Sequence, residues 1–185
     1  MKFKAIDTNY KGYKFRSRLE ARWAIYFDSV GLKWEYEKEG FEFEDGIKYL
    51  PDFWLPEVEM WAEVKHNDYF DWEDEEKKKV EYLVKSTKNP CILLCGVPEL
   101  KPYDCLVIPD NPNEPLLVNG LDIYDLMISN YHNYPHDEKR FYSCVGEYDG
   151  TEDSLINTFE DSYNASISAK SARFEFKRGE GNESN

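Results

Sequence analysis

Apolar residues recur at three- and four-residue intervals near the start of the chain, between Ser17 and Gly31. This spacing is typical of an amphipathic helix that packs one face on a core. Ser17 is a suitable N-cap and Gly31 a suitable end. The pattern therefore predicts a helix over residues 17–31. The apolar positions are Leu19, Trp23, Tyr26, Phe27 and Val30.

The next part of the chain alternates between apolar and charged side chains. Residues 32–46 indicate two short strands or one bent strand, and residues 47–54 and 58–65 indicate two more strands. Pro51 is acceptable there only at an edge or a bulge, because proline lacks an N–H. We therefore expect a β-meander directly after the helix.

The second half of the chain mixes helical and strand patterns. Acidic residues followed by lysines over 72–87 suit the dipole of a helix, and the apolar run at 91–97 suits a buried strand. The remaining predicted elements are strands at 106–108 and 116–118, a short helix at 122–131, an irregular surface segment at 132–153 and a helix at 153–176.

These elements predict the α/β class, with a small mixed sheet flanked by helices. Residues 1–100 carry the order helix, three-strand meander, helix, strand, which we expect to form the core. We expect residues 101–177 to be a C-terminal extension whose helices pack on or beside that core. The polar tail at 178–185 is expected to be disordered.

Composition limits the size and setting of the protein. A chain of 185 residues that is 41% hydrophobic can bury one sizeable core. The N-terminus lacks an apolar signal segment, and no stretch approaches the roughly 20 apolar residues of a membrane span. We therefore expect a soluble, cytoplasmic protein of a bacterial host or phage-infected cell. Cys91 and Cys95, in CILLC, are expected to be reduced core thiols rather than metal ligands.

The charge of the chain is unevenly distributed. The net charge is −14, yet residues 1–32 carry seven Lys or Arg against three Asp or Glu, while residues 51–150 carry nine against twenty-one. Only the N-terminal segment is therefore suited to a polyanion such as DNA. The candidate phosphate-binding residues are Lys11, Lys14, Arg16, Arg18 and Arg22. Aromatic residues Tyr10, Tyr13 and Phe15 lie among them and suit either base stacking or core packing.

Two carboxylates and an amine form the strongest chemical pattern. Asp52 follows a proline, and eleven residues later Glu63-Val64-Lys65 ends an alternating apolar run. Carboxylates suit Mg²⁺, which can lower the pKa of a bound water for phosphodiester hydrolysis. Glu63 and Lys65 share one face of a strand, so the amine can assist the attacking water. The carbonyl of Val64 is available as a further metal ligand. A solvated ion pair at a strand end is the alternative interpretation.

On these residues the chain resembles the PD-(D/E)xK nuclease superfamily. More narrowly, FRSRLEARWAIYFDSVGLKWEYE and YLPDFWLPEVEMWAEVK resemble the endonuclease I of lytic phages, a Holliday-junction resolvase, over roughly residues 13–97. The resemblance implies a restriction-endonuclease-like core, a metal-dependent endonuclease that uses Mg²⁺ or Mn²⁺, and branched or structured DNA as substrate. It also implies that Glu20 joins Asp52 and Glu63 in holding the metal. Two cuts in a symmetric junction would require a homodimer.

The chain departs from that family in two ways. It is acidic and has a long C-terminal part, and His66 follows the motif lysine where the family often has glycine. His66 suits either a proton shuttle or an ordinary surface position. The run Lys77 to Lys79 suits either phosphate contact or a paired, solvated helix face, because acids directly precede it.

Two further functions remain open. The acidic composition suits a nuclease-like binding protein without catalysis, which would meet a protein partner through its acidic surface as a phage counter-defence or DNA-mimic factor. The same chemistry would also serve a restriction-type or transposase-associated subunit that needs a separate targeting partner.

Overall fold

The computed structural model describes residues 6–99, 101, 103–107, 115–121 and 152–174. The predicted helix at 122–131, nearly all of the irregular segment at 132–153 and the tail at 178–185 lie outside the described residues. The strands are β1 (Thr8–Tyr10), β2 (Tyr13–Phe15), β3 (Glu35–Tyr36), β4 (Phe41–Glu42), β5 (Lys48–Tyr49), β6 (Phe53–Leu55), β7 (Met60–Lys65), β8 (Cys91–Cys95), β9 (Tyr103–Val107) and β10 (Leu116–Leu121). The helices are α1 (Arg18–Val30), η1 (Tyr69–Asp71), α2 (Asp74–Thr87) and α5 (Glu152–Ser171).

Helix α1 is confirmed with both predicted ends. The Ser17 hydroxyl accepts a hydrogen bond of 3.1 Å from the Glu20 N–H, which satisfies one of the free donors of the first turn. Gly31 ends the helix with φ at 75°, a left-handed conformation that glycine adopts at little cost. Local chemistry alone therefore fixes where this helix begins and ends.

The central sheet confirms the mixed α/β class. Its strand order is β10-β9-β8-β7-β6-β3, with β7 and β8 parallel and all other neighbours antiparallel. Helix α2 forms the crossover between the parallel pair. The predicted helix at 72–87 and the predicted strand at 91–97 are thus confirmed as α2, which begins two residues later, and β8, which ends two residues earlier.

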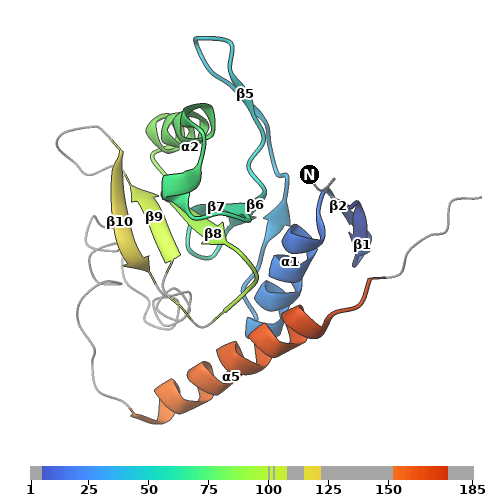
Figure 1. Ribbon diagram of the computed structural model, residues 1–185. Helices are drawn as coiled ribbons and strands as arrows, with labels where there is room; N and C mark the ends of the chain where they lie inside the picture. Colours follow the sequence, from blue (N-terminus) through green and yellow to red (C-terminus); the bar gives the residue numbers. More distant parts are fainter. Residues whose placement is uncertain (1–5, 100, 102, 108–114, 122–151, 175–185) are drawn as a thin grey trace, which may run out of the picture.

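The predicted strand over 47–54 is wrong as a single element. Its first part, β5, pairs with β4 in a separate two-stranded ribbon, whereas its last part belongs to β6 in the central sheet. The chain leaves strand conformation between them, from Leu50 to Asp52. Pro51 lies in this gap, because it cannot donate to a strand ladder. The result is a ribbon that extends beyond the sheet in Figure 1.

A β-hairpin before α1 was not predicted. Strands β1 and β2 pair directly across Lys11 and Gly12, whose φ angles are both positive at 46° and 85°. Two positive φ angles are the mark of the tight turn that joins twisted antiparallel strands. The glycine at position 12 was the available sequence signal.

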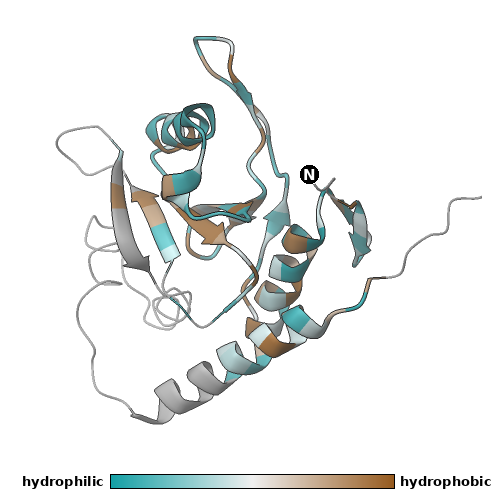
Figure 2. Cartoon of the chain, viewed as in Figure 1, coloured by the Kyte–Doolittle hydropathy of each residue, from teal (hydrophilic) through white to brown (hydrophobic). Residues whose placement is uncertain are grey.

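Helices cover both faces of the sheet, as Figure 1 shows. On β7, Ala62 and Val64 pack in the cluster formed with α1 and α5, whereas Trp61 packs in the cluster formed with α2. Strand β8 lies between these layers, so all five of its residues are buried, and Figure 2 draws it largely as hydrophobic. Cys91 and Cys95 are free thiols in this strand, as predicted.

The chain beyond residue 100 continues the same fold. Strands β9 and β10 extend the central sheet, where only shorter strands at 106–108 and 116–118 were expected. Helix α5, predicted over 153–176, packs along α1, where Ala165 and Ala169 are buried. The sheet therefore continues past residue 100, into the part of the chain that was expected to be a C-terminal extension. None of the helices among the described residues is both long and apolar enough to cross a membrane.

Candidate active site

Three buried carboxylates from separate elements line one cleft. Glu20 comes from the first turn of α1, Asp52 from the residue before β6, and Glu63 from β7, and their exposures are 7%, 3% and 5%. The cleft has a volume of about 710 Å³, and Arg16 and Lys65 also line it. Its walls include Lys48 and Tyr49 of the β4–β5 ribbon and Glu76 and Lys79 of α2.

Glu20 is held by the start of its own helix and by β3. Its Oε1 accepts a hydrogen bond of 2.7 Å from the Ser17 hydroxyl, so the capping pair orients the carboxylate. Its Oε2 accepts bonds of 2.6 Å from the Tyr36 hydroxyl and 3.1 Å from the Arg16 N–H. Burial and the bond to Glu20 raise the pKa of Tyr36, which keeps that hydroxyl a donor.

The side chain of Asp52, a candidate metal ligand, is bound to the backbone of β7 and to Arg16. Its Oδ2 accepts a hydrogen bond of 2.8 Å from the Val64 N–H, and its Oδ1 lies 2.6 Å from Arg16 Nη2. Burial, followed by repulsion from Glu63 and Glu20, raises the pKa of Asp52 well above its usual range. The three acids are therefore close enough to feel one another's charge.

Glu63 and Lys65 lie side by side on the α2 face of β7. Glu63 Oε2 accepts a hydrogen bond of 2.6 Å from the Tyr49 hydroxyl, and Oε1 is 3.2 Å from Lys65 Nζ. Burial raises the pKa of Glu63 although Lys65 and Tyr49 oppose that shift. Lys65 Nζ is also 3.2 Å from Glu76 Oε1, and lies 5.6 Å from the Trp72 ring centre. The amine is thus positioned beside the carboxylate cluster.

Several residues at the site had not been singled out from the sequence. Tyr49 and Glu76 each contact one of the predicted residues, Tyr36 contacts two, and Glu37 contacts Arg16. Tyr36 was recognised only as an apolar position of an alternating strand. Its contact with Glu20 depends on how β3 pairs with β6, which no local pattern encodes.

Of the five predicted phosphate-binding residues, one lines the cleft and the other four lie elsewhere on the described structure. Arg16 lines the cleft. Lys11 and Lys14 lie on the β1–β2 hairpin, where each forms an ion pair. Lys11 pairs with Asp28 at 3.0 Å, and Lys14 pairs with Asp7 at 2.7 Å. Arg18 is half-buried in the first turn of α1.

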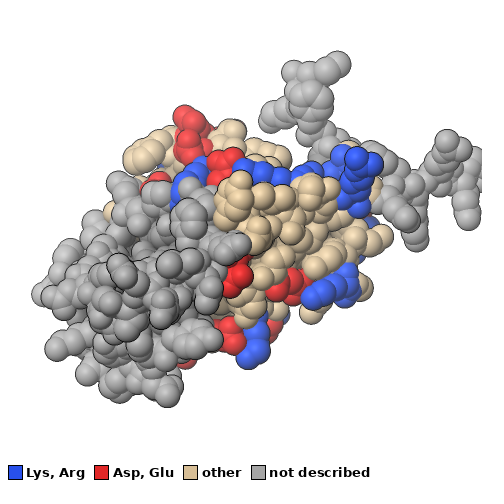
Figure 3. Space-filling view, turned by 90° about the horizontal axis from the view of Figure 1, so that it is seen from below, with Lys and Arg blue, Asp and Glu red and all other residues tan. Residues whose placement is uncertain are grey.

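The side chain of Arg22, on α1, contacts the C-terminal end of α5. Its Nη1 donates to the carbonyl oxygens of Ala169, at 2.7 Å, and Lys170, and its guanidinium lies over the Phe174 ring. Positive charge near a helix C-terminus is favourable, and here it joins α5 to α1. Figure 3, seen from below, shows both basic and acidic side chains on the described part of this face.

The remaining ambiguous residues also have defined surroundings. Phe15 is fully buried and its ring packs 4.4 Å from that of Tyr36, so it serves core packing. The Tyr10 hydroxyl donates to Asp28, whereas Tyr13 is 43% exposed. His66 is exposed just beyond β7.

The three consecutive lysines of α2 are held by neighbouring groups. Lys77 donates to the Phe70 carbonyl, and the other two form ion pairs, Lys78 with Asp45 at 2.8 Å and Lys79 with Glu75 at 2.6 Å. These contacts favour the interpretation of this run as a paired helix face. Lys79 additionally lines the cleft.

The oxygen atoms at the cleft are of the chemical kind that binds divalent cations. Carboxylate and carbonyl oxygens are the ligands that Mg²⁺ and Mn²⁺ prefer, and a cation would relieve the repulsion among the buried acids. Across the described ranges, however, no group of three or more His, Cys, Asp or Glu side chains is arranged to hold a metal ion. Oxygen atoms of all three acids contact protein groups, so a cation would have to share those oxygens or replace some of the contacts.

The comparisons with known proteins add no assignment. No protein-family model matches the chain, and no curated protein matches it. The residues of the cleft, their geometry and the sequence pattern that they form are therefore the basis for assigning a function.

Proposed function

We propose that the protein is a metal-dependent endonuclease that hydrolyses phosphodiester bonds in DNA, with a restriction-endonuclease-like core. The observation that carries this proposal is the convergence of Glu20, Asp52 and Glu63 with Lys65 in one cleft. Burying three acids so close together is unfavourable for folding, and a functional site is the usual reason for such an arrangement.

Each residue has a distinct role in the proposed reaction. Glu20, Asp52 and Glu63, with the carbonyl of Val64, would hold Mg²⁺ or Mn²⁺, which supplies Lewis-acid activation of water and charge neutralisation at the phosphate when bound. Lys65 orients the attacking water and stabilises negative charge on the phosphate. Its contacts with Glu63 and Glu76 fix the amine in place.

The substrate is proposed to be branched or structured DNA. This rests on the resemblance of the segment around Glu20 and of the Asp52 to Lys65 segment to phage junction resolvases. Paired cuts in a symmetric junction would be made by a homodimer.

Cleavage of defined DNA substrates tests the proposal. Purified protein is incubated with four-way junction, flap, single-stranded and linear duplex DNA in Mg²⁺ or Mn²⁺, beside Asp52→Asn and Lys65→Ala. Glu57→Gln is the matched control, because this carboxylate pairs with Lys33 away from the cleft. We expect metal-dependent cutting by the wild type and the control only. Absence of cutting on every substrate, or cutting that persists in both site variants, would contradict the proposal.

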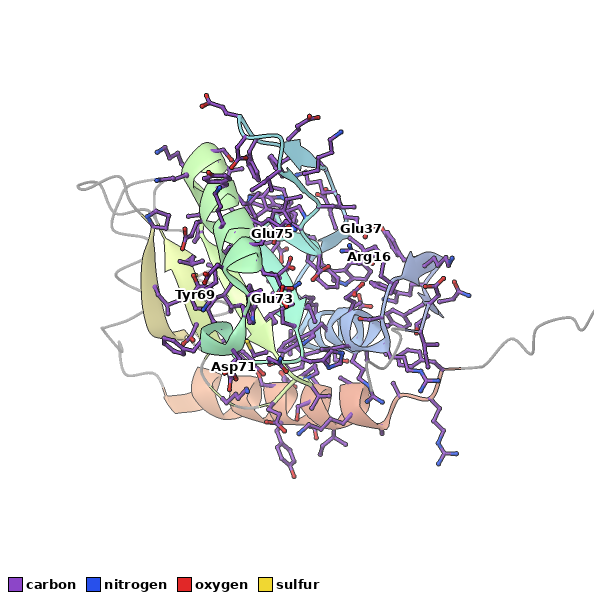
Figure 4. The ribbon with its side chains drawn as sticks, turned by 45° about the horizontal axis from the view of Figure 1, so that its top comes forward. Arg16, Glu37, Tyr69, Asp71, Glu73 and Glu75 are labelled. Atoms are coloured by element: carbon purple, nitrogen blue, oxygen red, sulfur yellow. The ribbon has the colours of Figure 1, made fainter. Side chains whose placement is uncertain are left out.

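One observation favours a second function, that of an acidic binding protein. Six acids, Asp68, Asp71, Glu73, Asp74, Glu75 and Glu76, lie within nine residues leading into α2. Figure 4 shows Glu73 and Glu75 on the α2 side, across from Arg16 and Glu37. Such a surface would suit a basic protein partner. In that case the Asp52→Asn variant and the wild type would bind the partner with equal affinity. Neither protein would cut any of the DNA substrates.

A further inference from the structure

Arg16 connects the carboxylates of the cleft. Its Nη2 lies 2.6 Å from Asp52 Oδ1, and its Nε lies 2.7 Å from Glu37 Oε1. The Arg16 N–H donates to Glu20 Oε2 at 3.1 Å and to the Tyr36 hydroxyl at 3.0 Å. One residue thus contacts two of the proposed metal ligands, Asp52 with its side chain and Glu20 with its main chain.

The contact with Asp52 uses an oxygen that a cation would need. The other oxygen, Oδ2, is already bound to the Val64 N–H at 2.8 Å. The guanidinium therefore takes one of the coordinating directions left on a carboxylate that is 3% exposed. A metal ion bound at the same oxygen would lie within a few Å of the Arg16 charge, and two cations this close repel each other.

Glu37 gives the guanidinium a second attachment. Its backbone has φ at 46°, a left-handed conformation that is uncommon for a non-glycine residue and unfavourable. Its N–H donates to the Asp52 carbonyl at 2.9 Å, so the turn is fixed to the same residue that Arg16 contacts. Figure 4 shows Arg16 and Glu37 together at one side of the cleft. The guanidinium can therefore leave Asp52 and still retain a carboxylate partner.

Among the described cations that line the cleft, Arg16 and Lys65 each pair with a proposed metal ligand, Asp52 and Glu63 respectively. Lys79 pairs instead with Glu75, whose carboxylate lies outside the proposed ligand set. Arg16 is 53% exposed while its partner Asp52 is buried, so its side chain has room to move into the open part of the cleft.

We propose that Arg16 is a built-in competitor of the metal: it neutralises Asp52 in the metal-free protein, and a divalent cation binds only by displacing its guanidinium. This inference rests on the proposed function, because it assigns Asp52 to the metal site. Displacement would leave Arg16 attached to Glu37 at the cleft, where its planar, forked donor group suits a phosphate.

The test is the affinity of the protein for Mn²⁺ alone, measured by isothermal titration calorimetry without DNA. We expect Arg16→Gln to bind Mn²⁺ about tenfold or more tightly than the wild type, because the substitution removes a positive charge that repels the metal ion at Asp52. Lys79→Gln is the matched control: it removes a cation from the same cleft without touching a proposed ligand, and should change affinity by less than about twofold. Asp52→Asn should weaken binding in either background.

Two measurements separate the possible failures. Unfolding of each variant in EDTA establishes that it is folded, and Arg16→Lys provides a milder change, because lysine cannot form the two-pronged contact and should compete less well than arginine. If folded Arg16→Gln or Arg16→Lys binds Mn²⁺ no more tightly than the wild type, the competition is refuted while the nuclease proposal stands. If neither the wild type nor any variant binds Mn²⁺, the proposed metal site and this inference both fail.

Discussion

The Tyr49 hydroxyl donates a hydrogen bond of 2.6 Å to Glu63 Oε2. Tyr49 belongs to the β4–β5 ribbon, which lies outside the central sheet, whereas Glu63 belongs to β7 within it. Phe41 of the same ribbon packs edge-on against Trp61 of β7, with ring centres 5.4 Å apart. The ribbon is therefore both a wall of the cleft and a support for one of its acids.

We expect Tyr49→Phe to lower both activity and stability. Loss of the hydroxyl leaves a buried carboxylate oxygen without its donor, which typically costs about 1–3 kcal/mol of unfolding free energy. The less restrained Glu63 should also lower the cleavage rate by about tenfold, by analogy with other groups that orient metal ligands. Urea unfolding and single-turnover cleavage measure the two effects.

Tyr82→Phe is the matched control for that change. The Tyr82 hydroxyl donates to Asp45 Oδ2, an exposed carboxylate at the tip of the same ribbon, at 3.0 Å. Water can replace this bond, so stability and cleavage should both stay close to wild type. If the two substitutions changed stability and cleavage equally, the packing of the ribbon, and not the hydrogen bond to Glu63, would be the cause.

Arg22→Ala should destabilise the protein rather than weaken DNA binding. The substitution removes donors to the Ala169 and Lys170 carbonyls and the contact with Phe174 that join α5 to α1. Hydrogen bonds of charged groups are worth about 1.5–3 kcal/mol, so urea unfolding should show a loss of that order. Lys14→Ala, on the exposed β2 strand, should leave stability nearly unchanged. Normal stability together with weakened DNA binding in Arg22→Ala would instead support the role first expected from the sequence.

The pH dependence of stability should carry the signature of the buried acids. The pKa values of Asp52 and Glu63 are raised in the folded protein, so the folded state holds protons that the unfolded state has released. The contribution of these two groups to the free energy of unfolding is fully present below their unfolded pKa values of about 4. It is lost as pH rises through their folded pKa values. In EDTA, the wild type should lose stability relative to Asp52→Asn from about pH 4 upward, with a slope of up to about 1.4 kcal/mol per pH unit and proton.

Urea unfolding of both proteins between pH 5 and 8 measures this difference. The difference between the two proteins is the relevant quantity, because ion-paired acids such as Glu57 and Glu99 have lowered pKa values and act in the opposite direction in both. A free-energy difference that does not vary with pH would mean that Asp52 has the same pKa in the folded and unfolded states.

The parts of this fold that were predicted correctly are those encoded locally. Ser17, the apolar spacing and Gly31 specify α1 within fifteen residues. The β1–β2 hairpin was missed, since its turn at Lys11 and Gly12 separates strands of only three residues. The break at Pro51 was read as a tolerated defect in one strand, although it directs β5 and β6 into different sheets.

The candidate site divides in the same way. Asp52, Glu63 and Lys65 form a compact sequence pattern, and the structure brings them together with Glu20 in one cleft. Tyr36, Tyr49 and Glu37 reach the cleft only through strand pairing and an unusual backbone angle, neither of which leaves a local pattern. Contacts between segments far apart in the chain therefore could not be predicted from the sequence alone.

Glu76→Gln tests whether α2 positions the amine of the site. Glu76 Oε1 lies 3.2 Å from Lys65 Nζ, and its Oε2 accepts a hydrogen bond of 3.4 Å from the Glu73 N–H at the start of α2. The amide can retain the capping bond but not the charge that attracts Lys65, so stability should fall by less than about 1 kcal/mol. Cleavage should fall more clearly, by about tenfold, because a displaced amine no longer meets the phosphate in its productive position. Glu75→Gln, one position earlier and paired with Lys79, should cut DNA like the wild type. Equal cleavage by both variants would show that Glu63 alone is enough to position Lys65.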